Sequence, residues 1–179
     1  MNKLRGSLIY LCGPIDSVSD GGIGWRLCIT PLLKEMGVIV LDPTNKPTYE
    51  LSELPADQER RRQLKLDGKF QELHEEGQAI RWFDLRCVDK ADAVIVYLDV
   101  SITMCGTIEE LCVANKQKKP CLVFCKQGKV AIPNWIYWML NPSYIFNDVG
   151  EVVEYLRRVD AGLEGDNRRW RLFDFGAIV

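Results

Sequence analysis

The chain has 179 residues, a net charge of −2 and 47% hydrophobic residues, a composition ordinary for one globular domain with a buried core. This charge argues against a nucleic-acid polymer as partner, because polyanions bind to broad basic surfaces. No apolar run approaches the roughly 20 residues that span a membrane, and the N-terminus does not resemble a signal peptide. We therefore expect a cytoplasmic protein that has no membrane partner.

Cysteine and histidine usage limits the chemistry. The chain has seven cysteines, none in the C-x-x-C spacing of a zinc or redox site, and a single histidine, His74, in a charged segment. We interpret the cysteines as reduced and mostly structural, with Cys12 and Cys105 as candidate pocket lining. No metal and no cofactor are expected, so carboxylates must carry most of any acid–base work.

The order of apolar and amphipathic segments predicts an α/β fold. Buried strands are expected at residues 8–12, 38–41, 93–98, 120–125 and 144–146, and helices at 25–36, 56–76, 79–90, 106–118 and 149–159. Strands separated by helices imply right-handed crossovers and a parallel sheet covered on both faces. We predict a doubly wound, flavodoxin-like sheet of five strands in the order 2-1-3-4-5.

One segment does not fit that alternation. Residues 44–55 are polar and marked by prolines, and residues 56–76 are dense in charged side chains with only a thin apolar stripe. A solvated helix carrying i,i+4 charge pairs explains this pattern. We interpret 1–179 as a single domain, with 44–78 as a charged helical insertion outside its core.

The predicted strand order places three segments around one crevice. The switch point lies between the first and third strands, where the loop after Cys12, the region 84–92 and the turn 105–110 converge. The turn opens a helix with paired carboxylates, Glu109 and Glu110. The positive end of the helix dipole would keep such a carboxylate ionised. The alternative is that both residues only complement the dipole.

Four stretches in this order resemble the nucleoside 2-deoxyribosyltransferase family and the related deoxynucleoside-monophosphate N-glycosidases. They are Ile9-Tyr10-Leu11-Cys12-Gly13, then Asp84-Leu85 with the strand opened by Asp92, then Gly106-Thr107-Ile108-Glu109-Glu110-Leu111, and the aromatic tail Phe173–Val179. The third stretch is similar to the family's G-T-x-x-E-L nucleophile motif, a register that selects Glu110 and not Glu109.

The resemblance implies roles for particular residues. Glu110 would attack the sugar C1′, Tyr10 would hydrogen-bond and orient it, and Asp84 would protonate the departing base. Tyr10 as core packing and Asp84 as a helix-surface charge remain alternatives. The residues expected to bind substrate are Cys12, Gly13, Asp16, Asp92, Met104, Gly106, Thr107 and Asn141. Asn141 lies near the place where family members contribute an amide to a neighbouring subunit's site. For Asp92, a capping or loop contact is the main alternative.

Two positions depart from the family pattern. Six residues before the nucleophile, the nucleoside transferases carry an aspartate and the monophosphate hydrolases a phosphate-binding serine, whereas this chain has Met104. Asp99, Ser101 or Thr103 could substitute in contacting the 5′ end of the sugar. Asp16 stands where a phosphate-binding loop would favour a basic side chain, although Ser17, Ser19 and glycine amides could form an anion-binding nest.

Three functions remain open from the sequence. The first is transfer of 2-deoxyribose from a nucleoside to a free nucleobase, and the second is hydrolysis of a deoxynucleoside or its 5′-monophosphate. The third is a non-catalytic nucleotide-binding module, since fold does not determine function. Two interpretations fit the aromatic segment that contains Trp135, Tyr137 and Trp138. Either these side chains stack on a base, or they pack in a core or interface, which is more common for aromatic clusters. Together with the aromatic tail they predict a homo-oligomer.

Overall fold

The central sheet has the predicted topology. The structure, a computed structural model, describes residues 2–46, 53, 55–164 and 169–170. Its five strands are β1 (Leu8–Cys12), β2 (Ile39–Leu41), β3 (Ala93–Leu98), β4 (Cys121–Cys125) and β5 (Ile145–Phe146). All strand pairs are parallel and the order is β2-β1-β3-β4-β5. The flavodoxin-like prediction is therefore confirmed.

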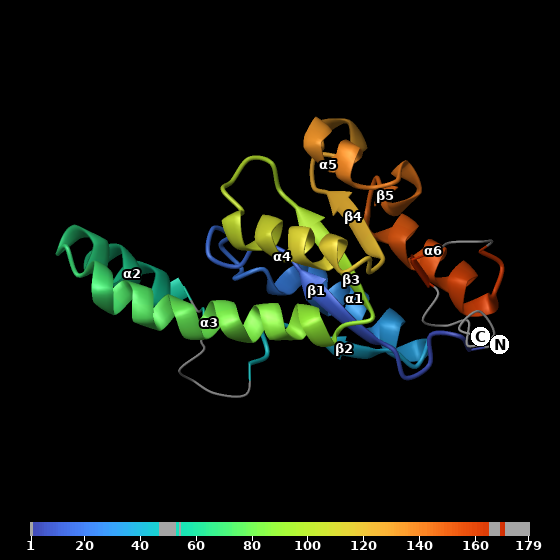
Figure 1. The fold of residues 1–179 in the computed structure, drawn as a ribbon, viewed down its shortest axis with the longest axis horizontal. Coiled ribbons are helices and arrows are strands. Elements are labelled where there is room, and N and C mark those ends of the chain that lie inside the picture. The colour runs from blue at the N-terminus through green and yellow to red at the C-terminus, as the bar shows by residue number, and fades with distance from the viewer. Residues whose placement is uncertain (1, 47–52, 54, 165–168, 171–179) are drawn as a thin grey trace.

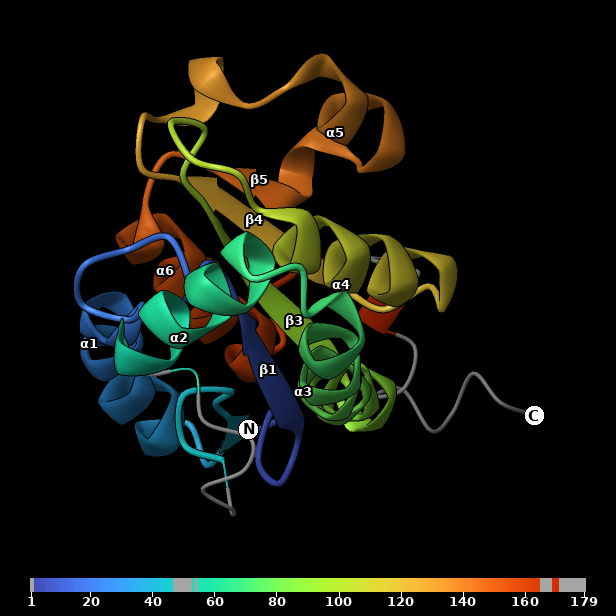
Figure 2. The ribbon, with the colours of Figure 1, turned by 90° about the vertical axis from the view of Figure 1, so that its left-hand side faces the viewer.

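Helices cover both faces of the sheet (Figures 1 and 2). The helices are α1 (Ile23–Glu35), α2 (Pro55–Leu66), α3 (Phe70–Lys90), α4 (Cys105–Lys116), α5 (Asn134–Met139) and α6 (Val149–Ala161), with short 3-10 turns η2 (Lys129–Ala131) and η3 (Pro142–Tyr144). Figure 2 shows α1 and α6 on one side of the strands and α3 and α4 on the other. None of the described helices is both long and apolar enough to cross a membrane.

Alternation along β1 decides which side chains meet the candidate site. Ile9 and Leu11 belong to the core shared with α1 and α6, whereas Tyr10 and Cys12 belong to the core shared with α3 and α4. Successive side chains of a strand point to opposite faces, so the tyrosine and the cysteine lie on the same face. This face is also the one against which α4 packs its buried residues Thr107, Leu111 and Ala114.

The charged helical segment differs from its prediction. The sequence predicted one helix over 56–76 and a second over 79–90, with a break near Gly77. The break lies instead at residues 67–69, where Gly68 has a φ of 70°, and α3 runs through Gly77 without interruption. A single helical glycine costs only about 1 kcal/mol, and the stripe of Ile80, Asp84 and Val88 buries the helix against the sheet. Figure 1 shows α2 and the first turns of α3 projecting beyond the sheet, and we call this part the α2–α3 arm.

Candidate active site

A cavity of about 380 Å³ opens at the carboxyl edge of the sheet. Its walls come from the end of β1 and the loop after it, from the start of α4, from α3 and from residues on the α2 side. Of the residues predicted from the sequence, the cavity lining includes Tyr10, Gly13, Asp16, Asp84, Met104, Gly106, Thr107 and Glu110. The structure thus brings most of the predicted set to one place.

Glu110 is bonded by two side chains of β1. The Tyr10 hydroxyl donates to Glu110 Oε1 at 2.9 Å, and the Cys12 thiol donates to Glu110 Oε2 at 2.8 Å. Both donors are fully buried. Each carboxylate oxygen therefore has one fixed partner and keeps a further lone pair for chemistry. Cys12, expected as pocket lining, instead contacts the carboxylate directly from beneath the cavity.

Burial, and not the helix dipole, dominates the electrostatics of Glu110. The first turn of α4 holds no acidic residue, and Glu110 lies in the second turn. The dipole acts mainly within the first turn, so the expected stabilisation of the anion is weak here. Burial raises the pKa of Glu110, while the bonds from Cys12 and Tyr10 and the charge of Arg26 pull the pKa back down. The net effect is a raised pKa for Glu110, and the two neutral donors and Arg26 favour its anionic form against the effect of burial.

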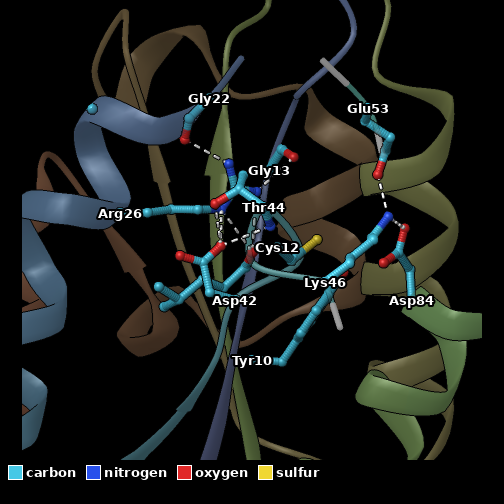
Figure 3. Close-up of polar contacts among 12 residues, drawn as sticks. Tyr10, Cys12, Gly13, Gly22, Arg26, Asp42, Thr44, Lys46, Glu53 and Asp84 are labelled. Carbon is cyan, nitrogen blue, oxygen red and sulfur yellow. Dashed lines mark hydrogen bonds and ion pairs between the residues drawn. The ribbon is translucent and has the colours of Figure 1, made fainter. Parts of the chain in front are cut away.

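Asp84 is the second buried carboxylate of the cavity, and a lysine binds it (Figure 3). Lys46, in the loop after β2, places its Nζ 3.1 Å from Asp84 Oδ2 and also pairs with Glu53. Asp84 Oδ1 is buried and has no hydrogen-bond partner among the described residues. Asp84 is therefore not a helix-surface charge, since it lies on the buried stripe of α3 and lines the cavity.

The pKa of Asp84 lies near neutrality. The pKa of Asp84 is raised from 3.8 to about 7, chiefly by burial; Lys46 opposes this rise, and the negative charges of Glu53 and Glu110 add to it. A carboxyl group with such a pKa exchanges protons readily at neutral pH, which is what a general acid and base requires.

Glu109 has a different environment from its neighbour. Its side chain is 39% exposed and forms a bidentate pair with Arg81 of α3, with one bond of 2.8 Å. This pairing lowers the pKa of Glu109. The two adjacent glutamates thus differ in their surroundings: Glu110 is buried against β1, whereas Glu109 is exposed and pairs with α3.

Besides Cys12, two residues expected to bind substrate, Asp92 and Asn141, do not line the cavity. Asp92 lies at the amino end of β3, where its Oδ2 accepts a 2.8 Å bond from the backbone of Leu8. In a parallel sheet this is the edge opposite to the cavity, so Asp92 holds the pairing of β1 and β3, as its alternative interpretation supposed. Asn141 is exposed before η3, and its side chain accepts a bond from the backbone of Ser143.

The positions that depart from the family pattern have distinct surroundings. Met104 precedes α4 and lines the cavity, with its sulfur 3.1 Å from the backbone nitrogen of Asp99. Asp99 is fully buried and bonded to Lys126, Gln127 and Ser101, so its carboxylate is already occupied. Of the proposed substitutes for the missing contact, only Thr103 lines the cavity.

Charged residues from distant parts of the chain complete the site. Arg61 of α2 pairs with Asp16 at 3.5 Å, and Lys65 of the same helix lines the cavity. A second cavity of about 470 Å³ adjoins the first beneath the α2–α3 arm and shares Asp84 and Glu110 with it. Sequence reasoning missed this contribution, because it treated the charged segment as a solvated helix.

Arg26 fixes the loop that follows β1 (Figure 3). Its guanidinium is 1% exposed and donates to the carbonyl oxygens of Leu11, Gly13 and Gly22 at 2.6 to 3.3 Å. Nothing in the sequence marked this arginine.

A topological signal could have found Lys46. A loop that leaves the carboxyl end of β2 must reach the same edge of the sheet as the cavity.

Among the described residues there is no group of three or more His, Cys, Asp or Glu side chains that could hold a metal ion. The predicted tail Phe173–Val179 lies outside the described residues.

Comparison with known proteins gives a structural likeness. No protein-family model matches the chain, and no curated protein matches it in sequence. A 2-deoxyribosyltransferase from Bacillus psychrosaccharolyticus, described as a biocatalyst for nucleoside synthesis, matches 83% of this chain and 92% of its own, with a TM-score of 0.58 and 20% identity. A 2-deoxyribosyltransferase from Leishmania mexicana matches 84% of this chain and 96% of its own, with a TM-score of 0.52 and 18% identity. The chain has the fold of the 2-deoxyribosyltransferases.

Proposed function

We propose that this protein belongs to the nucleoside 2-deoxyribosyltransferase family and transfers 2-deoxyribose between nucleobases, with Glu110 as nucleophile. The observation that carries the proposal is the pairing of Glu110 with Tyr10 and Cys12 in a cavity that also presents Asp84. One carboxylate is oriented and the other has a pKa of about 7. This division of roles suits displacement at a sugar carbon with a proton delivered to the leaving group.

The two half-reactions use the same groups in opposite directions. A Glu110 oxygen attacks C1′ as the C1′–N bond breaks, and protonated Asp84 gives its proton to the departing base. A second base then attacks C1′, the ester bond to Glu110 breaks, and ionised Asp84 accepts the proton of the incoming base. Charge and atoms balance over the cycle, and the enzyme returns to its starting state.

Hydrolysis of a deoxynucleoside 5′-monophosphate is the second candidate, and one observation favours it. Lys65 lines both cavities and has no ion-pair partner among the described residues. A 5′-phosphate would complement its charge, and water would then replace the acceptor base. Asp16, also in the lining, opposes such an anion but is paired with Arg61.

One assay separates these activities. Deoxynucleosides and their 5′-monophosphates are incubated with the protein, each with and without free adenine or cytosine, and products are followed by chromatography. We expect a new nucleoside only when an acceptor base is present. Release of base without an acceptor indicates hydrolysis, and inertness towards the whole panel indicates a binding module. Glu110→Gln serves as the inactive control.

We also propose a cytoplasmic homo-oligomer that binds small nucleosides or nucleotides and free bases. Trp135 and Trp138 of α5 are 68% and 74% exposed and contact each other edge to face. Exposed paired tryptophans are typical of an interface. Light scattering at micromolar concentration should give a mass above 20.5 kDa, and a monomer would remove the cross-subunit role of Asn141.

A further inference from the structure

Lys46 is a buried cation beside the proposed catalytic acid. Its side chain is 4% exposed and lies between two carboxylates, Asp84 of α3 and Glu53. Its ammonium is also 5.8 Å from the centre of the Phe83 ring. An ammonium group loses several kcal/mol of hydration when it is buried, so a lysine remains charged in such a place only where anions compensate for it. Here both compensating anions line the cavity.

The geometry assigns different partners to the two oxygens of Asp84. Oδ2 is bonded to Lys46, whereas Oδ1 has no partner among the described residues. Most buried polar atoms in proteins have a hydrogen-bond partner, and a buried carboxylate oxygen without a donor is costly. A catalytic role is one of the explanations for such an unsatisfied atom. An ammonium on one oxygen restricts rotation of the carboxylate, while the other oxygen is buried without a partner among the described residues.

We propose that Lys46 is a positioning residue for Asp84, which it holds through Oδ2 in one orientation at the cavity and whose anion it stabilises after proton transfer. The proposal rests on the proposed function for its catalytic consequence. The binding of Asp84 by Lys46 is independent of it and can be tested in the free protein.

Such a residue assists both half-reactions. When Asp84 donates its proton to the leaving base, the new negative charge forms 3.1 Å from a fixed ammonium. That arrangement needs little reorganisation at the moment of reaction. The same ammonium keeps a fraction of Asp84 ionised at neutral pH, which the second half-reaction requires.

Charged groups from several elements act on Asp84, and they act in opposite directions. The pKa of Asp84 is about 7 as the net result: burial, Glu53 and Glu110 raise it, and Lys46 lowers it. Tyr10 of β1 and Cys87 of α3 also interact with Asp84, and neither is charged at neutral pH since burial raises the pKa of both. Removing Lys46 and removing Glu53 should therefore shift the titration of Asp84 in opposite senses.

The experiment is a titration of Asp84 by NMR with carboxyl-labelled aspartate, using Asp84→Asn to identify the signal. In Lys46→Met the pKa of Asp84 should rise by about one unit or more, as expected when a close opposite charge is lost. In Glu53→Gln it should fall. Lys90→Met, which removes an exposed lysine at the end of the same helix, should leave the titration unchanged.

Kinetics with a deoxynucleoside and acceptor base supply the second readout. Since Asp84 must be protonated to release the base, the alkaline limb of the pH–rate profile should move to higher pH in Lys46→Met and to lower pH in Glu53→Gln. Lys46→Arg should restore a limb close to that of the parent protein. A uniform loss of rate without a shift in the limb contradicts a positioning role.

The outcomes separate this inference from the proposed function. If Asp84 titrates identically in the parent protein, Glu53→Gln and Lys46→Met, Lys46 does not act on Asp84 and the inference is wrong. If Lys46→Met does not fold, Lys46→Gln takes its place, since it removes the charge and keeps a polar side chain, and an unchanged pKa of Asp84 in that variant contradicts the inference. If the titrations shift as expected but no substrate reacts, the inference on Lys46 and Asp84 stands while the proposed function fails.

Discussion

The two buried carboxylates of the cavity are held in different ways. Glu110 is bonded by neutral donors from one strand, the Tyr10 hydroxyl and the Cys12 thiol. Asp84 is bonded by the charged Lys46, which comes from a loop and is shared with Glu53. The first arrangement depends on the core of the sheet and the second on the surroundings of the α2–α3 arm.

This difference matches the demands of the two proposed roles. A nucleophile must be anionic and oriented, and neutral donors orient it without cancelling its charge. A proton donor must change its charge in every turnover, and a neighbouring cation stabilises the form that results. The comparison predicts that changes around Glu110 affect bond formation at C1′, whereas changes around Asp84 affect proton transfer and its pH dependence.

The largest expected effect separates Glu110 from its neighbour. Glu110→Ala should lower turnover by roughly 10³- to 10⁶-fold with the fold intact, because a covalent nucleophile is lost. Glu109→Ala should have a mild effect, since Glu109 is paired with Arg81 at the surface. Activity and circular dichroism check this, together with mass spectrometry of a 2-deoxyribosyl adduct trapped with a fluorinated analogue. An adduct on Glu109 or Asp84, or equal losses at both glutamates, contradicts the assignment.

Asp84→Asn tests proton transfer. Turnover should fall by roughly 10²- to 10⁴-fold, the usual contribution of a general acid. In the parent protein the rate should decrease as the pH rises through about 7, where Asp84 loses its proton, and this limb should disappear in the variant. Donors with easily displaced bases should lose least. Asp89→Asn, an exposed change on the same helix, is the control, and a limb that persists in Asp84→Asn assigns the acid to another group.

Arg26→Met tests whether the loop after β1 depends on the buried guanidinium. Three backbone carbonyl oxygens lose their donor, so the free energy of unfolding should decrease by about 2–4 kcal/mol. Urea unfolding measures the change. Lys34→Met, an exposed substitution on the same helix, should cost about 1 kcal/mol or less. Equal losses in both variants show that the loop is held by other contacts.

Tyr10→Phe should have the smallest effect of the set. The ring remains in the core while one donor to Glu110 is lost, which predicts a decrease in rate of roughly 10- to 100-fold. The hydroxyl lowers the pKa of Glu110, so its removal should raise that pKa and move the acidic limb of the profile to higher pH. Tyr137→Phe, which removes a bond to the backbone of Lys129, is the matched control. An unshifted limb indicates that Tyr10 is only core packing.

The parts of this site that lie in regular elements could be predicted from the sequence. Strand periodicity and crossover rules give the order of the sheet, and alternation along β1 then places Tyr10 and Cys12 on the face of α4. Asp84 follows from the buried stripe of α3, at four-residue spacing from Ile80 and Val88. In each case the period of the element determines the direction of the side chain.

The contacts from loops could not be predicted in this way. Lys46 and Glu53 belong to a segment without periodicity, and their meeting with Asp84 depends on the course of the loop after β2. Asp92, by contrast, could have been placed correctly, because it opens β3, and in the predicted parallel sheet the first residues of the strands lie at the edge opposite to the cavity. The break at Gly68 was missed because Gly77 is an equally plausible interruption in the sequence.

The position of Gly22 has a consequence for the motion of the loop that follows β1. Its φ is 71°, and a Cβ there would lie 2.3 Å from the carbonyl oxygen of Pro14. Together with Arg26 this close approach joins the two ends of the loop into a small ring that is anchored to α1. Amide hydrogens at its ends should exchange with solvent as slowly as those of the helix, while those at its tip exchange freely. The loop should therefore open only when the start of α1 unfolds with it.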